Sequence, residues 1–532
     1  MGGLRLILSE NRRISHSYPG DSAATRFFMT LRIFNTLTGK KDPIKPLEAG
    51  HVKLYVCGIT SYDYCHIGHA RSALAFDMLA RYLRFSGLKV TYVRNFTDVD
   101  DKIIKRAAEK GVPWDELAQR FIDEFYVDMD ALGVLRPDIE PKATEHITEM
   151  MDIIGNLVEQ CVAYPSGGDV FFAVDKFPQY GRLSGRQLTD MQAGARVSVN
   201  EAKKNPMDFV LWKASKPGEP SWPSPWGPGR PGWHIECSAM SRKYLGNTFD
   251  IHGGGQDLIF PHHENEIAQS EAANHCPFVR HWMHHGFVTI DNEKMSKSLN
   301  NFSTVREIFE HYDPEVLRFL IFSTHYRNPL DFSEAAMEDA AIGLERLYRC
   351  LARLDEALGG EPDGGTEHSQ GGASVSTDKD RALLTGLDDR FREAMDNDLN
   401  TAVALAALFE VVKCMNRLVK SAAEAGGWGK DDLPLLRGAG GTLRRLGGVM
   451  GLLQRPPQEF FRAHRAKLLV GCPLSEETID GKIAERDRAR AAKDWAASDA
   501  IRDQLAAQGV LLKDGPDGTI WTAKKNLQSP TK

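Results

Sequence analysis

The sequence lacks a long apolar run, because no stretch approaches the roughly 20 consecutive apolar residues that a membrane-spanning helix needs. This absence predicts a protein without a membrane segment. The eight cysteines are scattered over 532 residues, unlike the dense cysteine pattern of small disulfide-stapled secreted domains. They are therefore expected to be reduced thiols or metal ligands in a cytoplasmic protein.

Positive charge is not in excess either. The chain has 66 Lys and Arg residues against 72 Asp and Glu residues, a net charge of −6 at pH 7. No global basic field therefore indicates a nucleic-acid partner, and any such surface has to be a local patch. Residues 461–532 carry a slight local excess of Lys and Arg, which an ordinary solvated face also shows.

What is present is ordinary in bulk. Hydrophobic residues make up 42% of the chain and charged residues 26%, values typical of a globular protein. The length allows about three or four domains. No internal repeat is apparent.

The most informative stretch runs from a short apolar strand at residues 54–56, through Gly58 and His66-Ile-Gly-His69, into a helical pattern over residues 70–85. A strand, a glycine turn and a helix N-terminus form the phosphate-binding arrangement of α/β nucleotide domains, because free backbone N–H groups and the positive helix end favour an anion. Two histidines at the first helical turn can both face that anion. Taken alone, four such residues occur more often at helix starts that bind nothing.

The rest of the chain alternates between recognisable patterns. Residues 89–93 are an apolar, β-branched run typical of a buried parallel strand. Residues 249–252 are predicted to form another strand of the core, and residues 253–257 a tight, exposed backbone at its end. Between them, the proline- and glycine-rich stretch 217–231 favours an insertion. Further predicted elements are a hairpin over 167–172, a strand over 209–212, helices over 115–163, 303–355 and 380–453, and one last helix followed by a hairpin over 474–525.

Four donor side chains suggest a metal site. Cys57, Cys237, His262 and Glu266 supply two thiols, an imidazole and a carboxylate, a reasonable ligand set for Zn²⁺. Their four-residue spacing puts His262 and Glu266 on one face of a helix. Such a pair is more often a salt bridge, and a lone buried cysteine is more often part of a core. The spacing therefore permits a metal site without establishing one.

Two short motifs together resemble the signatures of class I aminoacyl-tRNA synthetases. They are His66-Ile-Gly-His69 and Lys294-Met-Ser-Lys-Ser298. Longer strings resemble the cysteinyl-tRNA synthetase family more closely than any other class I enzyme, and the likeness spans residues 31–521. Those strings are Tyr55-Val-Cys-Gly-Ile-Thr60, Gly232-Trp-His-Ile-Glu-Cys-Ser238, Phe249-Asp-Ile-His-Gly-Gly-Gly-Gln-Asp-Leu258 and Phe260-Pro-His-His-Glu-Asn-Glu266.

The predicted fold is an α/β Rossmann-like (HUP-type) catalytic domain with a parallel sheet and an insertion domain. An all-α anticodon-binding bundle and a small α+β C-terminal module follow. The predicted parts are a disordered extension (1–30), the catalytic domain (31–150 and 249–302), a connective insertion (151–248), a helical stem-contact segment (303–355), a flexible loop (356–379), the bundle (380–460) and a C-terminal tRNA-binding module (461–532). For the extension a transit peptide is the alternative, against which Glu10 and Asp21 count.

The resemblance implies a cytoplasmic, monomeric ligase that activates L-cysteine with ATP and transfers it to the 3′ end of tRNA-Cys. One Zn²⁺ per chain would bind the substrate thiolate and select against serine, which needs no editing domain. Mg²⁺ would accompany ATP. By resemblance, the roles fall on His66, His69, Lys294 and Lys297 as catalytic residues, on Gly58, Gly68, Asp257 and Lys297 for ATP, on Trp233 for the cysteine pocket, and on Cys57, Cys237, His262 and Glu266 for zinc.

Several alternatives remain open from the sequence. Asp257 is equally a turn residue, Trp233 a core residue, and Trp495 either a platform for an anticodon base or a core residue. A related ligase that couples cysteine to a sugar amine lacks the anticodon half, and a tRNA-binding paralogue lacks catalysis. Because every predicted small-molecule contact lies before residue 300, activation is expected to survive truncation near residue 330.

Overall fold

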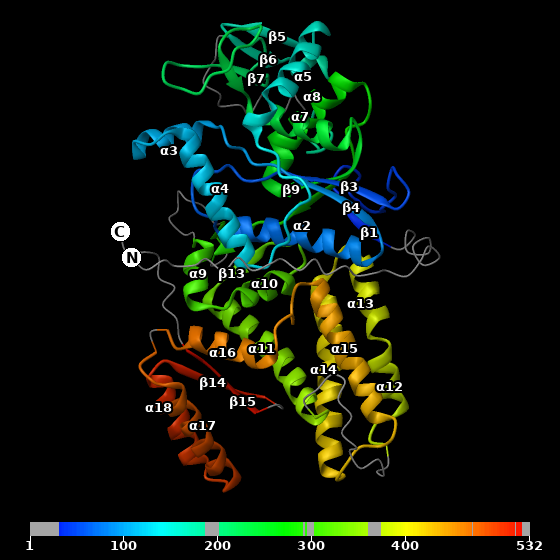
Figure 1. Cartoon of the computed structure of the whole chain (residues 1–532), viewed down its shortest axis with the longest axis vertical. Helices are drawn as coiled ribbons and strands as arrows, with labels where there is room; N and C mark the ends of the chain where they lie inside the picture. The colour runs from blue at the N-terminus through cyan, green and yellow to red at the C-terminus, as the bar shows by residue number, and fades with distance from the viewer. Residues whose placement is uncertain are drawn as a thin grey trace, which may run out of the picture.

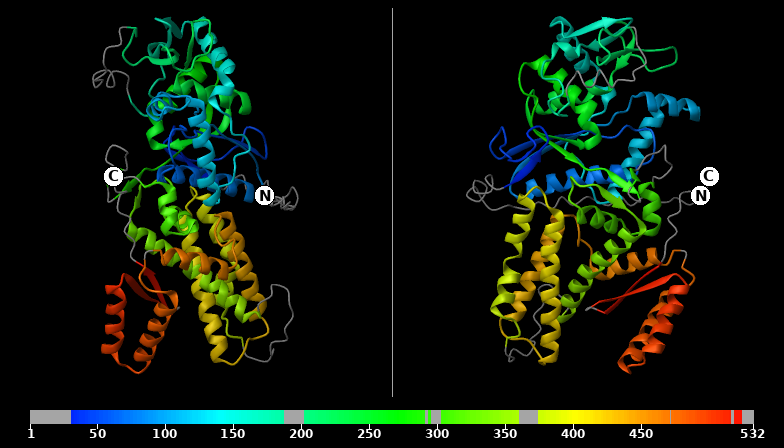
Figure 2. Two further views of the ribbon diagram at one scale, coloured as in Figure 1. Left: turned by 60° about the vertical axis from the view of Figure 1, so that its left-hand side comes forward. Right: turned by 180° about the vertical axis from the view of Figure 1, so that it is seen from behind.

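The structure is a computed structural model that describes residues 31–186, 202–290, 293–294, 303–359, 374–470, 472–515 and 518–523. The predictions for residues 1–30, for most of the 356–379 loop and for Lys297 lie outside these ranges. The molecule is elongated, with the insertion at one end, the parallel sheet in the middle, and the helical bundle and C-terminal module at the other end (Figure 1; Figure 2). No helix within the described ranges is both long and apolar enough to cross a membrane.

Four parallel strands form the central sheet, in the order β10-β9-β3-β4. They are β3 (His51–Val56), β4 (Lys89–Arg94), β9 (Phe249–Gly255) and β10 (Val279–His285). Helix α2 (Ile67–Phe85) connects β3 to β4 and covers one face of the sheet (Figure 1). Leu54 and Val56 point into the core on that face, whereas Tyr55 points into the core on the other. Burial on both faces confirms the predicted parallel α/β sheet.

The insertion covers the second face of the sheet. It contains an antiparallel four-stranded sheet, order β5-β6-β7-β8, and three helices share its core with Tyr55 and Phe249. The predicted hairpin turns at Gly167 and Gly168, whose φ angles of 62° and 89° suit glycine. The elements on this face are α5 (Ile147–Glu159), β5 (Ala163–Ser166), β6 (Asp169–Phe172), η2 (Val174–Lys176), β7 (Phe209–Ala214), β8 (Gly229–Pro231) and α7 (Trp233–Leu245). The connection between β9 and β10, outside the predicted insertion, adds η3 (Gln256–Leu258), the π-turn η4 (Ile259–His263) and α8 (Glu264–Asn274).

Smaller elements surround the sheet. The hairpin β1-β2 precedes it, and α3 and α4 follow β4. A three-stranded sheet, order β12-β11-β13, follows β10. The bounds are β1 (Arg32–Asn35), β2 (Lys40–Pro43), α3 (Asp101–Lys110), α4 (Trp114–Ala131), η1 (Ala143–His146), β11 (Val288–Ile290), β12 (Glu293–Lys294) and β13 (Leu330–Phe332).

The C-terminal half is helical, and its main bundle shares one continuous core with α2 and the sheet. The last two helices and a hairpin form a separate small module with its own core. The elements are α9 (Val305–His311), α10 (Pro314–Ser323), α11 (Glu334–Ala357), α12 (Asp378–Thr385), α13 (Leu387–Asp396), α14 (Thr401–Glu424), α15 (Asp432–Val449), α16 (Pro457–Leu468), α17 (Glu476–Ala491), α18 (Trp495–Ala507), β14 (Val510–Gly515) and β15 (Gly518–Ala523).

Three local predictions were wrong. The segment 303–355 is not wholly helical, because buried Leu330 and Phe332 alternate in strand β13, which pairs with β11. The glycines that open the 253–257 segment are buried at the end of β9, where Phe76 presses against Gly253, rather than exposed. The single helix predicted after residue 474 is two helices, because the backbone turns at Lys493, whose φ is 61°.

Candidate functional site

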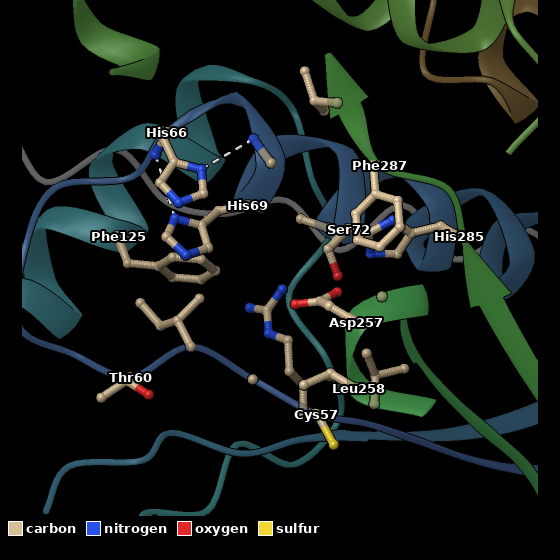
Figure 3. Close-up of a pocket in the computed structure, with 18 of the residues that line it drawn as sticks. Cys57, Thr60, His66, His69, Ser72, Phe125, Asp257, Leu258, His285 and Phe287 are labelled. Carbon is tan, nitrogen blue, oxygen red and sulfur yellow. Dashed lines mark hydrogen bonds between the residues drawn. The ribbon is translucent and has the colours of Figure 1, made fainter. Parts of the chain in front are cut away.

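A pocket of about 400 Å³ opens where β3 ends and α2 begins. Its lining includes Cys57, Gly58, His66, Gly68, His69, Asp257 and Trp233, which the sequence analysis had assigned to ATP, cysteine or metal. These residues come from the β3–α2 segment, the start of α2, α7 and η3, so the fold brings distant motifs together. Figure 3 shows His66 and His69 on one side of the pocket, with Asp257, His285 and Phe287 on the other.

The two signature histidines are fixed by their own backbone. The Nδ1 atom of His66 accepts a hydrogen bond from the N–H of Gly68 at 3.1 Å, and Nδ1 of His69 accepts one from the N–H of His66 at 3.3 Å. The two rings stack with their centroids 3.8 Å apart. Because each Nδ1 is an acceptor, each ring carries its proton on Nε2. Each histidine is thereby oriented as an Nε2–H donor at the positive end of α2, which suits a phosphate oxygen.

Gly58 is required by the packing of the pocket floor. A Cβ atom built on Gly58 would lie 1.5 Å from the backbone oxygen of Asn95. The Gly58 N–H also donates to Oδ1 of Asn95 at 2.9 Å. The ends of β3 and β4 can therefore approach this closely only with glycine at this position.

The second signature motif lies mostly outside the described residues. Lys294 ends strand β12, and only its backbone is described, while Lys297 is not described at all. Both flanks of the motif nevertheless reach the pocket. Val288 of β11 lines it, and Thr304 forms a β-bridge with His66 on the other flank.

The four predicted metal donors converge beside this pocket. Sγ of Cys57 is 3.6 Å from Sγ of Cys237 and 3.6 Å from Oε1 of Glu266. Nε2 of His262 is 3.6 Å from Sγ of Cys237 and 3.0 Å from Oε1 of Glu266. Three of the four are buried, whereas Cys57 is partly exposed and also lines the pocket. The donor cluster and the pocket therefore share a wall.

These separations fit a tetrahedral zinc site. A Zn²⁺ ion with bonds of about 2.0–2.3 Å has ligand–ligand separations of about 3.3–3.8 Å. The four separations given above, 3.0–3.6 Å, are close to that range, and all four donor atoms lie within 4.8 Å of one another. The chemistry of the set also fits, because zinc binds thiolates, imidazoles and carboxylates.

Electrostatics in the cluster favours ionisation of two donors, Cys237 and Glu266, whereas burial and the neighbouring Cys237 raise the pKa of Cys57 well above its ordinary value. A hydrogen bond from Cys57 and the nearby His262 lower the pKa of Cys237 to about 6, against the opposing effect of burial. Burial raises the pKa of Glu266, but His252 and His262 outweigh it and bring that pKa to about 2. Although burial opposes it, Glu266 and Cys237 raise the pKa of His262 to about 10, so a protonated His262 balances these anions, and a bound metal ion would take over that role.

Sequence reasoning missed a group of histidines around the donors. A second set of potential ligands, Cys57, His252, His263 and Glu266, overlaps the first. Nε2 of His252 is 2.8 Å from Oε2 of Glu266, and Nδ1 of His263 is 2.8 Å from Nε2 of His284. Three histidines within residues 281–285, at the end of an apolar run, were the available signal.

Trp233 connects the donors to the pocket. Its side chain is 40% exposed, and its ring stacks on His262 with the centroids 4.1 Å apart. It also lines the pocket, so it is not simply a core residue. Trp495 is 60% exposed, which removes the core alternative for that residue.

Comparison with known proteins follows the same division of the chain. The family described as tRNA synthetases class I (C) catalytic domain matches residues 43–342. The DALR domain matches residues 390–454, and the cysteinyl-tRNA ligase anticodon binding domain matches residues 476–521. Because an anticodon-binding family also matches, the alternative of a sugar-amine ligase finds no support.

Similar proteins lead to the same family as these domain matches, and a solved structure has the same fold. A cysteine–tRNA ligase of Desulfotalea psychrophila is 60% identical over 93% of this chain and 100% of its own length. One of Geobacter sulfurreducens is 54% identical with the same coverage. The fold is also that of Mycobacterium tuberculosis methionyl-tRNA synthetase in complex with methionyl-adenylate, with a TM-score of 0.57 at 18% identity, covering 78% of this chain and 93% of that one. The chain belongs to the cysteine–tRNA ligase family of class I aminoacyl-tRNA synthetases.

Proposed function

We propose that this enzyme activates L-cysteine with ATP to give cysteinyl-adenylate and pyrophosphate, then transfers the acyl group to the 3′ end of tRNA-Cys. It acts as a monomer, and Mg²⁺ enters with ATP. The observation that carries the proposal is the wall shared by the nucleotide pocket and the donor cluster, where Cys57 belongs to both. A small substrate held there has its sulfur beside the donors and its carboxylate beside the nucleotide.

Cys57, Cys237, His262 and Glu266 would hold one Zn²⁺ ion. That ion would supply a borderline-soft position that binds a thiolate far better than a hydroxyl, which is the difference between cysteine and serine. The stacked ring of Trp233 covers His262 and walls the cysteine side of the pocket. Hydrogen bonding alone separates the two substrates poorly, so this contact would provide selectivity without an editing site.

The chain's own groups then have a positioning task. The nucleophile is the substrate carboxylate, which is already ionised at neutral pH, so no general base is needed. His66 and His69 direct their Nε2–H groups at phosphate oxygens, and Asp257 offers a carboxylate to the ribose hydroxyls. Lys294 and Lys297 would stabilise charge on the leaving pyrophosphate.

The test is cysteine-dependent ATP–pyrophosphate exchange, followed by charging of tRNA-Cys, with serine as the competing substrate. The proposal expects exchange with cysteine and almost none with serine, and charging only of tRNA-Cys. Equal exchange with cysteine and serine would overturn the selectivity proposal, and absence of exchange would overturn the activation step.

A further inference from the structure

A four-residue loop, His325–Asn328, lies between two buried charged side chains, and we name it the clamp loop. It connects α10 to β13. Arg71, from the second turn of α2, contacts it from the side of the catalytic sheet. Asp398, from the connection between α13 and α14 of the bundle, contacts it from the other side.

All the described hydrogen bonds of the Arg71 side chain go to backbone oxygens. Its side chain is 1% exposed. Nε donates to the backbone oxygen of Gly286 at 3.1 Å, and Nη2 donates to that of Tyr326 at 3.1 Å and to that of Asn328. Burial lowers the pKa of Arg71 to about 10, so the guanidinium remains charged at neutral pH. A buried cation bound in this way fixes α2 and the clamp loop relative to each other.

Asp398 holds the opposite side of the clamp loop. It is fully buried. Oδ1 accepts from the Tyr326 hydroxyl at 2.6 Å and from the backbone N–H of Phe34 at 2.8 Å, and Oδ2 accepts from Nε of Arg327 at 2.8 Å. One bundle carboxylate therefore satisfies donors from the clamp loop and from β1.

The clamp loop reaches the nucleotide pocket by two short routes. The N–H of Gly286, a pocket-lining residue, donates to the backbone oxygen of Tyr326 at 2.8 Å. A Cβ atom on Gly286 would lie 2.4 Å from the backbone oxygen of Asn328, so only glycine at position 286 lets the pocket wall and the clamp loop approach this closely. Directly after the clamp loop, β13 pairs with β11, which in turn pairs with β12 and its final residue, Lys294.

We propose that Asp398 is a positioning residue for cysteine activation, so that the bundle shapes the nucleotide pocket even when no tRNA is bound. The inference rests on the proposed activation step. A displacement of the clamp loop moves Gly286 at the pocket wall and β13 behind the second signature motif. It also releases Arg71, which lies two residues from His69. In the proposed mechanism these segments lie on the nucleotide side of the pocket, and none of them contains Cys57, Cys237, His262 or Glu266.

The experiment compares full-length Asp398→Asn with Asp432→Asn. The first change keeps the size of the side chain but places an NH₂ group against Phe34, Tyr326 or Arg327, so at least one donor loses its acceptor. Asp432 is a matched control, because it is 1% exposed, lies in the same bundle and accepts several hydrogen bonds. Its described hydrogen-bond partners all lie in residues 374–376 and at Gly429, away from α2.

Exchange is measured without tRNA, per mole of zinc-loaded protein. Asp398→Asn is expected to lower kcat about tenfold or more, because small misplacements of reacting groups cost about that much or more. The KM for cysteine and the zinc content should remain those of the wild type, and Asp432→Asn should keep the wild-type kcat. If Asp398→Asn does not fold, Tyr326→Phe removes a single hydroxyl from the same carboxylate, and a smaller fall in kcat of the same kind is expected.

The results that overturn the inference are distinct. Wild-type exchange by Asp398→Asn, with a defect only in tRNA charging, means that the bundle acts through RNA alone. An equal fall in Asp432→Asn means that bundle stability, and not the clamp loop, controls kcat. Absence of exchange in the wild type itself would instead refute the activation step, and with it the inference.

Discussion

Replacement of Cys237 by serine tests the metal site most directly. Sγ of Cys237 lies 3.6 Å from both Cys57 Sγ and His262 Nε2, so it occupies one corner of the proposed tetrahedron. Four-ligand zinc sites bind with an apparent free energy of roughly 10–16 kcal/mol at pH 7. One donor of four therefore contributes about 3–4 kcal/mol, which corresponds to roughly 10²–10³-fold in zinc affinity.

Serine in place of Cys237 is expected to weaken zinc binding strongly for two reasons. Its hydroxyl is not ionised at neutral pH, whereas hydrogen bonds from Cys57 and His262 lower the pKa of Cys237 to about 6. Oxygen of this kind is also a poorer zinc ligand than thiolate sulfur. We therefore expect Cys237→Ser to lose zinc in dialysis against a mild chelator that leaves the wild type loaded. Its KM for cysteine should rise much more than its KM for ATP.

The assay is zinc content by elemental analysis across a chelator series, with exchange kinetics on the same samples. Cys350→Ser is the control, since Cys350 is also buried but lies in α11, away from the donors. The overlapping set Cys57, His252, His263 and Glu266 does not include Cys237. If Cys237→Ser keeps zinc at wild-type affinity, the metal uses that second set and the reasoning here is refuted.

Three further changes test the pocket. Gly58→Ala should lower the rate of exchange by about 10²-fold or more, because its Cβ would lie 1.5 Å from the backbone oxygen of Asn95. The control Gly155→Ala, at a helical position with open space around it, should keep its activity and gain up to about 1 kcal/mol of stability. Equal effects of the two changes in exchange assays and thermal melts would contradict this prediction. Lys297→Ala should lower kcat roughly 10²-fold with little change in cysteine binding, as for a charge contact made mainly in the transition state, and an equal loss in cysteine affinity by equilibrium binding would count against it. Truncation at residue 330 should abolish exchange in a chain that is still soluble, and a truncated chain with wild-type exchange would show that β13 and the bundle are dispensable.

The last of these predictions reverses the expectation from sequence, and the reason is physical. Sequence motifs placed every small-molecule contact before residue 300, so the C-terminal half looked separable. Oδ1 of Asp398 accepts a hydrogen bond from the N–H of Phe34, although the two residues are 364 positions apart in the chain. No local sequence pattern predicts such a contact. Periodicity identifies which face of a helix is buried, but it does not identify the element that buries it.

Local signals, by contrast, were sufficient for the strand–glycine–helix arrangement at residues 54–85. An apolar strand, a required glycine and a helix start are all written in neighbouring residues, and the structure places α2 there. The break between α17 and α18 was missed because Lys493 is a good helix former by propensity. Only Asp494, whose side chain caps α18 by accepting from the N–H of Ala497, marked the new helix.

The histidine group shows a different limit. His252, His263 and His284 come from three elements, and each has its described partner on another element or on Glu266. His263 and His284 are buried, and burial lowers their pKa values. From the sequence alone, such histidines cannot be told from ordinary core residues. Their role becomes visible only when the donors Cys57 and Glu266 are placed beside them.

Helix α2 explains why the two halves of the chain cannot be understood separately. His66 caps its N-terminus and His69 lies in its first turn, while its later turns carry Asp77 and Tyr82, which face the C-terminal half. Asp77 pairs with buried Arg318 of α10, whose Nε also donates to the backbone oxygen of Met450 at 3.0 Å, directly after α15. Tyr82 donates to Asp396 of α13 at 2.7 Å. Buried ion pairs add little net stability over apolar packing, but they fix one arrangement among several. Contacts of this kind hold α2, whose first turn faces the nucleotide pocket, against the bundle as well as against the sheet.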